Sequence, residues 1–111
     1  MELSEVTGDR LMQIFATLAN PHRMRIMAAL ASGEDYVSRL ARELGISRAL
    51  LQVHLRKLEA AGLVTSRLVL SEDGKAMKFY EIEPFSLHLT PEVLAAAALS
   101  LTADRTQGDH Q

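Results

Sequence analysis

One stretch of this sequence, residues 48–61, combines side-chain types and a spacing that are suited to reading DNA. Its polar residues recur every three or four positions, so a helix would present them as a single stripe opposite a row of leucines. An arginine can bind guanine through two hydrogen bonds, and a glutamine can bind adenine in the same way. A solvated helix surface has a similar composition, so the stripe alone leaves both interpretations open. The stripe consists of Arg48, Gln52, Arg56 and Glu59, and the residues opposite it are Leu51, Leu55 and Leu58.

Basic side chains gather in the middle of the chain. The formal net charge is −2, yet residues 39–78 carry eight basic and four acidic side chains. A basic centre on an acidic protein can attract a nucleic acid through its phosphates, although chance clustering on a mixed surface would give the same count. The basic residues are Arg39, Arg42, Arg48, Arg56, Lys57, Arg67, Lys75 and Lys78.

Composition excludes several other classes of protein. A chain of 111 residues suits one domain, and the lack of cysteine excludes disulfides, thiolate metal sites and cysteine nucleophiles. The sequence contains no glycine-rich phosphate loop and no histidine–carboxylate cluster placed for acid–base work, so we do not expect an enzyme. No apolar run approaches the roughly 18 residues that span a bilayer, and the acidic start MELSEVTGDR is unlike a signal peptide. These features predict a cytoplasmic protein without a membrane partner.

The elements that must position the stripe can be read from periodicity and from helix-capping residues. Helices are predicted at about 8–19, 22–32, 35–44 and 48–61, and the Gly45-Ile46-Ser47 turn makes the last two a helix-turn-helix. Residues 63–70 and 77–83 are rich in strand formers and flank an Asp73-Gly74 turn, which predicts a β-hairpin. Thr90-Pro91-Glu92 begins a final helix that we expect to reach about residue 103. The predicted fold is mainly α, in the order α-α-α-α-β-β-α. The domain spans 8–103, between flexible ends at 1–7 and 104–111.

The final predicted helix is apolar almost all round and must therefore be buried. Nothing in so short a chain remains to cover it, so a second copy of the same helix is the economical partner. The first predicted helix carries an apolar stripe that could join this interface. The predicted dimer contacts are Leu11, Ile14, Phe15, Leu18, Leu94, Ala97, Ala98 and Leu101.

Three stretches together resemble the ArsR/SmtB family of winged-helix transcriptional regulators: ALANPHRMRIMAAL, LARELGISRALLQVHLRKLEAAGLV and the hairpin that ends in KFYEI. The resemblance implies a homodimer that binds double-stranded DNA at a palindromic operator. In that family, DNA is released when a metal ion or another effector binds. The base-facing positions of the family fall on Arg48, Ala49, Gln52 and Val53. For phosphate contacts we expect Arg39, Arg42, Arg56, Lys57, Arg67, Lys75 and Lys78, and we expect Ser47 at the start of the helix. His54 is expected to be half-buried, with a structural or phosphate-contacting role.

The known effector sites of the family are not carried over. Tyr36 and Ser38 stand where some members have two cysteines, and VLAAAALSL in the last helix lacks the ligands that other members place there. Any metal ion, of the nickel or zinc class, would need oxygen and nitrogen ligands, although scattered surface histidines are the alternative. The candidate ligands are His88, Glu92, Asp104 and His110. Two further alternatives remain open: a small organic effector, and a winged-helix protein–protein module that does not bind DNA.

Overall fold

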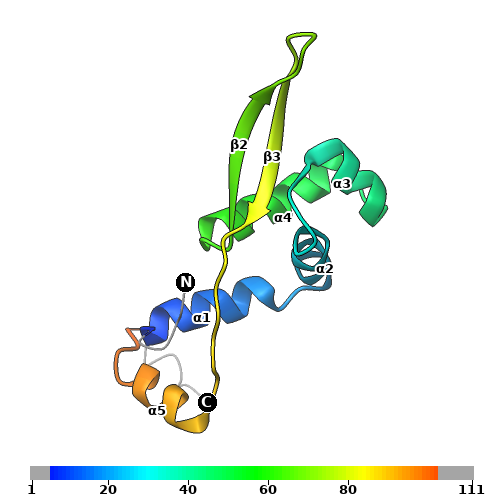
Figure 1. Ribbon diagram of the computed structural model, residues 1–111. Helices are drawn as coiled ribbons and strands as arrows, with labels where there is room; N and C mark the ends of the chain where they lie inside the picture. The colour runs from blue at the N-terminus through cyan, green and yellow to red at the C-terminus, as the bar shows by residue number, and fades with distance from the viewer. Residues whose placement is uncertain (1–5, 103–111) are drawn as a thin grey trace. The chain divides into compact units, whose positions relative to one another are not determined.

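The computed structural model describes residues 6–102, which contain five helices and three strands. The chain divides into two compact units. Residues 16–84 form one, which we call the central unit, and residues 1–15 with 85–111 form the other, which we call the terminal unit. The mainly α fold with a small β-hairpin is confirmed (Figure 1). The elements are α1 (Gly8–Leu18), α2 (Pro21–Leu30), β1 (Asp35–Tyr36), α3 (Val37–Leu44), α4 (Arg48–Ala60), β2 (Val64–Leu70), β3 (Ala76–Ile82) and α5 (Pro91–Ala98).

The helix-turn-helix of the central unit forms where the local signals predict it. Gly45 ends α3 in the left-handed conformation, with φ of 69°, which a residue with a Cβ rarely adopts. Ser47 then caps α4, because its Oγ accepts a hydrogen bond of 3.0 Å from the backbone N–H of Leu50. The two caps fix the ends of the turn between α3 and α4.

The core of the central unit lies between the helices and the base of the hairpin. The leucine row of α4 is fully buried there, which confirms the predicted inward face. Burial of each leucine contributes about 1.5–3 kcal/mol, so this row fixes the rotation of α4 about its own axis. The core residues with no exposed surface are Ile26, Leu40, Leu51, Leu55, Leu58 and Leu63.

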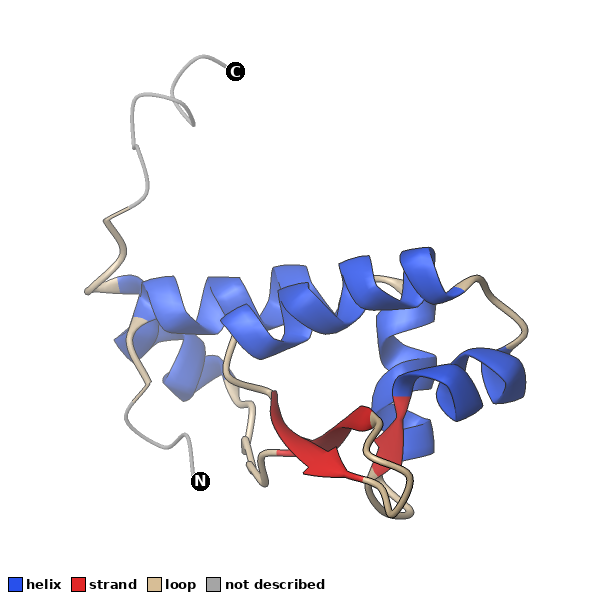
Figure 2. Cartoon of the chain, turned by 90° about the horizontal axis from the view of Figure 1, so that it is seen from above, coloured by secondary structure: helices blue, strands red, loops and turns tan. Residues whose placement is uncertain are grey.

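The sheet contains a strand that the sequence does not reveal. Asp35 and Tyr36, predicted as the start of a helix, pair antiparallel with β3 opposite Tyr80 and Phe79, and the strand order is β1-β3-β2. The ring of Tyr36 packs edge-on against that of Phe79 at 5.4 Å between centroids, which favours the extended backbone. The helix α3 therefore begins at Val37, and the short strand lies beside the hairpin (Figure 2, red).

The hairpin of β2 and β3, which we call the wing, turns at the predicted Asp73-Gly74. Gly74 has φ of 81°, and the backbone N–H of Ser71 donates to the carbonyl of Lys75 at 2.8 Å across the turn. Glu72, Asp73 and Lys75 at the turn are polar and exposed. The apolar side chains of Leu68 and Leu70 on β2 are also exposed, at 71% and 75%. The outer half of the wing therefore combines an acidic tip with exposed apolar residues.

In the terminal unit, α5 is shorter than expected. The helix ends at Ala98, whereas the sequence predicts an end near residue 103, which lies outside the described residues. Beyond Ala98 the chain turns toward the start of α1. The hydroxyl of Ser100 accepts a hydrogen bond of 2.9 Å from the backbone N–H of Gly8, and the carboxylate of Asp9 accepts one from the backbone N–H of Thr102. These contacts draw residues 100–102 out of the helical path.

The apolar surface of α5 is largely uncovered within a single chain. Ala97 is buried, whereas Leu94, Leu99 and Leu101 are 44%, 90% and 41% exposed. None of the described helices is both long enough and apolar enough to cross a membrane. The predicted ends, residues 1–7 and 104–111, lie outside the described range except for Val6 and Thr7.

Candidate nucleic-acid interface

The helix α4 presents its outward face opposite the buried leucine row. An α-helix turns by about 100° per residue, so Ala49, Val53 and Arg56 lie diametrically across from Leu51, Leu55 and Leu58. All three outward residues are exposed, as is Lys57 beside them. This face is the part of α4 that is free to enter a groove of DNA.

Arg48, Gln52 and Glu59 lie on a different flank of α4, the one turned toward the wing. Glu59 accepts a hydrogen bond of 2.9 Å from the hydroxyl of Ser66 on β2. Arg48 and Gln52 line a hollow whose opposite wall is β3. The predicted polar stripe is therefore divided: Arg56 faces outward and the other three residues face the wing.

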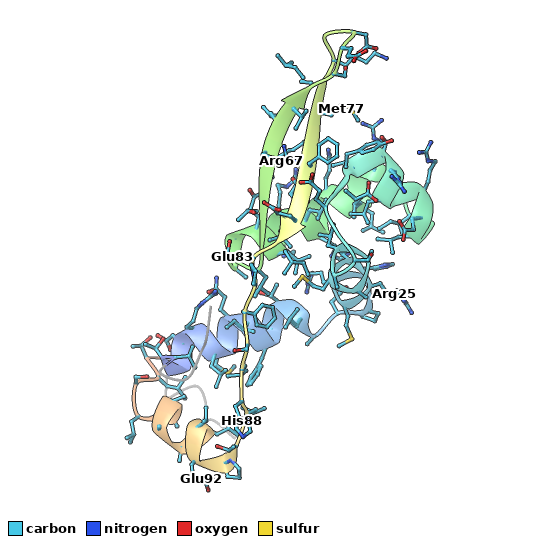
Figure 3. The ribbon with its side chains drawn as sticks, viewed as in Figure 1. Arg25, Arg67, Met77, Glu83, His88 and Glu92 are labelled. Carbon is cyan, nitrogen blue, oxygen red and sulfur yellow. The ribbon has the colours of Figure 1, made fainter. Side chains whose placement is uncertain are left out.

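The hollow between α4 and the wing lies within the central unit and has a volume of about 200 Å³. The start of α3, the first half of α4 and the first residues of β3 form its walls. Met77, labelled on the wing in Figure 3, belongs to it. The full lining is Tyr36, Val37, Ser38, Arg48, Gln52, Ala76, Met77 and Lys78.

Two of the arginines predicted to contact phosphate already have partners within the chain. The guanidinium of Arg67 binds both carboxylate oxygens of Glu34, at 2.5 Å and 3.2 Å, and this ion pair raises the pKa of Arg67. The same guanidinium lies 5.6 Å from the ring centroid of Phe79. Arg39 on α3 lies 3.9 Å from a carboxylate oxygen of Asp35, four residues earlier in the chain. The Arg39 pair links β1 to α3 and the Arg67 pair links the residue before β1 to β2, and both pairs reduce the charge available to DNA.

The remaining basic candidates are exposed and form no ion pair within the described residues. Arg42 lies on α3, Arg48, Arg56 and Lys57 on α4, Lys75 in the wing turn and Lys78 on β3. The ammonium of Lys78 lies 5.3 Å from the ring centroid of Tyr80, at the edge of the hollow. The structure thus brings Arg48 and Lys78 to the same hollow from two separate elements.

His54 is the one predicted DNA contact that is buried, with 7% of its surface exposed. Its Nδ1 lies 3.1 Å from Nη1 of Arg23 on α2, and the ring of His22 lies 5.1 Å away between centroids. An arginine can only donate, so Nδ1 accepts and the neutral ring carries its proton on Nε2. Arg23 also donates to the carbonyl of Thr17. Arg23 is not among the residues predicted from the sequence, because only the folded chain brings it to His54.

The predicted dimer contacts and metal ligands differ in how far they are exposed in a single chain. Leu11, Ile14 and Ala97 are buried, Phe15 and Leu18 are half-buried, and Leu94, Ala98 and Leu101 are exposed. His88 and Glu92 are exposed near the start of α5 (Figure 3). In the described part of the chain, no three His, Asp or Glu side chains gather as a metal site. Asp104 and His110 lie outside that part.

Comparison with known proteins agrees with this geometry. The family described as "Bacterial regulatory protein, arsR family" matches residues 20–66, which run from the cap of α2 into β2. An uncharacterised HTH-type transcriptional regulator of Methanocaldococcus jannaschii is 39% identical over 77 residues, covering 69% of this chain and 80% of that protein. The chain belongs to the ArsR family. It is a winged helix-turn-helix transcriptional regulator, and not an enzyme.

Solved structures share the ArsR-type fold. HlyU from Vibrio cholerae is 26% identical with a TM-score of 0.59, and the match covers 86% of this chain and 91% of HlyU. The homodimeric winged helix-turn-helix DNA-binding domain of a possible ArsR-family regulator from Mycobacterium bovis has 24% identity and a TM-score of 0.59, covering 93% and 85%. At that identity the second likeness shows the fold alone.

The His54–Arg23 contact predicts a loss of stability in acid. Burial first, and then the charge of Arg23, lower the pKa of His54 below its ordinary 6.5. The unfolded chain therefore takes up the proton more readily than the folded one. The free energy of unfolding should be constant above about pH 6.5 and should fall below it. We expect His54→Asn, whose side-chain oxygen can accept from Arg23 but cannot titrate, to show a smaller fall.

Urea denaturation of both proteins between about pH 5 and pH 8 measures this difference. Because the other histidines are unchanged in the variant, the difference between the two pH profiles reports on His54 and on the groups in contact with it. Parallel profiles would show that His54 titrates alike in the folded and unfolded chains, against this prediction.

Proposed function

We propose that this chain is a homodimeric, sequence-specific regulator that binds a palindromic operator with α4 of each copy in a major groove. The observation that carries the proposal is the exposed outward face of α4, held by a buried leucine row and a capped start. In helix-turn-helix proteins the second helix reads base edges while the first crosses the phosphate backbone. Arg42 lies on α3, the first helix of the pair, and is exposed, so it can contact the phosphate backbone.

Charge supports DNA as the partner rather than another protein. Arg48, Arg56 and Lys57 make the accessible surface of α4 basic, and its acidic residue, Glu59, is bound to Ser66. A protein-binding module without DNA would favour an apolar or acidic face. The acidic wing tip, Glu72 and Asp73, opposes deep insertion into a groove, so we assign the wing a backbone-contacting role.

The two units suit separate tasks, DNA contact by the central unit and dimerisation by the terminal unit. Exposed leucines on and after α5 supply an apolar surface, and the related domain from Mycobacterium bovis is homodimeric. A two-fold dimer would place its half-sites about one helical turn apart. A palindromic operator follows from the dimer because the two-fold symmetry of the protein is mirrored in the DNA sequence.

Selection of bound duplexes from a random pool tests the proposal. At about 0.1 M salt, purified protein should enrich a two-fold symmetric sequence with half-sites about 34–36 Å apart, centre to centre. The selection should be repeated with Ni²⁺ and with Zn²⁺, because the sequence does not determine whether an effector releases the protein from DNA or is required for binding. Failure to enrich any sequence under all three conditions would overturn the proposal.

The dimer contact can be tested by charge. Leu94→Glu with Leu99→Glu should give monomers, because each leucine at the interface contributes about 1.5–3 kcal/mol and a buried carboxylate costs more. Both side chains are exposed in a single chain, so the helical content should be retained. Sedimentation velocity at about 10 µM distinguishes monomer from dimer, because this concentration is well above the sub-micromolar dissociation constant that we expect for the wild-type dimer.

Leu68→Glu with Leu70→Glu is the matched control. It makes the same chemical change at two exposed leucines of the wing and should remain dimeric. A wild-type monomer, or a dimeric Leu94→Glu/Leu99→Glu variant, would remove the terminal unit from this role.

For the effector, we propose that a nickel or zinc ion binds in the dimer and not in the single chain. One chain offers His88 and Glu92 within its described residues, too few for a closed site, whereas two copies would double the set. Calorimetric titration of each ion should show saturable binding to the wild type and none to His88→Ala. Equal binding to both proteins, or none to either, would leave a small organic effector as the alternative.

A further inference from the structure

The hollow between α4 and the wing lies where DNA backbone must pass in the proposed complex. A major groove and its neighbouring minor groove are separated by one sugar–phosphate strand. If α4 occupies the major groove and the wing lies toward the minor groove, that strand runs between them. We propose that the hollow holds one phosphodiester group of the operator, bound by Arg48 and Lys78. This inference rests on the proposed function.

The charge of the lining fits an oxyanion. Arg48 and Lys78 are its two cationic residues, and no carboxylate lines it. Ser38, Tyr36 and Gln52 add neutral hydrogen-bond donors on the same walls. Hydrogen bonds from cationic donors to phosphate oxygens are among the stronger ones in proteins. A phosphate bridging the hollow would also neutralise two like charges that approach from α4 and β3.

Ion pairing distinguishes the cations of the hollow from two other predicted phosphate contacts, Arg39 and Arg67. Arg67 also lies on the wing, but two of its guanidinium nitrogens donate hydrogen bonds to the carboxylate of Glu34. Neither Arg48 nor Lys78 has an ion-pair partner among residues 6–102. Arg48 and Lys78 thus line the hollow from α4 and from β3, whereas the paired Arg67 does not line it.

The size of the hollow favours a single charged group over an organic effector. Pockets for drug-sized ligands have volumes of about 300–1,000 Å³. At about 200 Å³ and open to solvent, this hollow is smaller than that range. A backbone phosphate brings its own binding energy from the remainder of the duplex and needs no enclosure.

The assignment changes the role of Arg48. It becomes a residue that positions the duplex by contacting a phosphate, and it does not read a base. Reading falls to the outward face of α4, where Ala49 and Val53 can contact thymine methyl groups and Arg56 can bind guanine. Sequence preference should therefore depend on residues one stripe away from the Arg48–Gln52 flank.

Single methylphosphonate substitutions in the selected operator test the contact, because each removes the charge of one phosphate. At one position per half-site, substitution should weaken binding of the wild type about tenfold. Lys78→Ala and Arg48→Ala should each weaken binding to unmodified DNA, and should show little further loss at that same position. Arg48→Ala should select the same sequence as the wild type. Arg48 and Lys78 are exposed, so both variants should fold.

Lys75→Ala is the matched control, since it removes an exposed cation of the wing turn that forms no ion pair within the described residues and does not line the hollow. It should lose the same factor as the wild type at the sensitive phosphate. Multiplicative losses at every phosphate for Lys78→Ala, or a changed base preference for Arg48→Ala, would overturn the inference and leave the proposed function standing. A wild-type chain that selects no sequence would overturn both.

A last measurement separates DNA phosphate from a free anion. Inorganic phosphate should compete with DNA no better than sodium chloride at the same ionic strength, because the hollow alone offers few contacts. Stronger competition by inorganic phosphate would assign the hollow to a free oxyanion and would contradict the backbone assignment.

Discussion

The burial of three leucines on α4 is the constraint on which the interface depends. Leu51, Leu55 and Leu58 have no exposed surface, so α4 cannot rotate without opening the core. Their inward direction sends Ala49, Val53 and Arg56 outward, and it turns Arg48 and Gln52 toward the wing. In the proposed complex, the same apolar contacts that stabilise the fold would therefore decide which polar side chains reach DNA bases and which reach its backbone.

A second interaction ties α4 to the start of α2. Arg23 binds both His54 and the carbonyl of Thr17 near the end of α1, so three helices meet at one guanidinium. The buried imidazole is satisfied only when neutral, which couples the placement of α4 to the protonation of one residue. A hydrogen bond of this kind depends on direction, whereas the packing of the leucines is tight but non-directional, so the two interactions complement each other.

The sequence predicts those features that depend on local signals. The leucine spacing and the Gly45 and Ser47 caps predict the helix-turn-helix, and Asp73-Gly74 predicts the wing, because each acts within a few residues. The features it does not reveal all join distant residues. The two-residue strand β1 has no periodicity of its own and exists through pairing with β3. The Glu34–Arg67 and Arg23–His54 contacts likewise form only in the folded chain, as does the hollow that divides the polar stripe of α4.

The strand order β1-β3-β2 leaves β2 as a sheet edge in the described chain, with unpaired backbone groups beside Leu68 and Leu70. An open edge with apolar side chains is a template for strand addition by another molecule, and such edges promote aggregation. Arg67 precedes the apolar residues 68–70 of β2, and Glu72 and Asp73 follow them at the turn. These charges disfavour the stacking of one wing on another, so the same ion-paired arginine that braces the sheet also helps to keep the protein from self-associating through its wing.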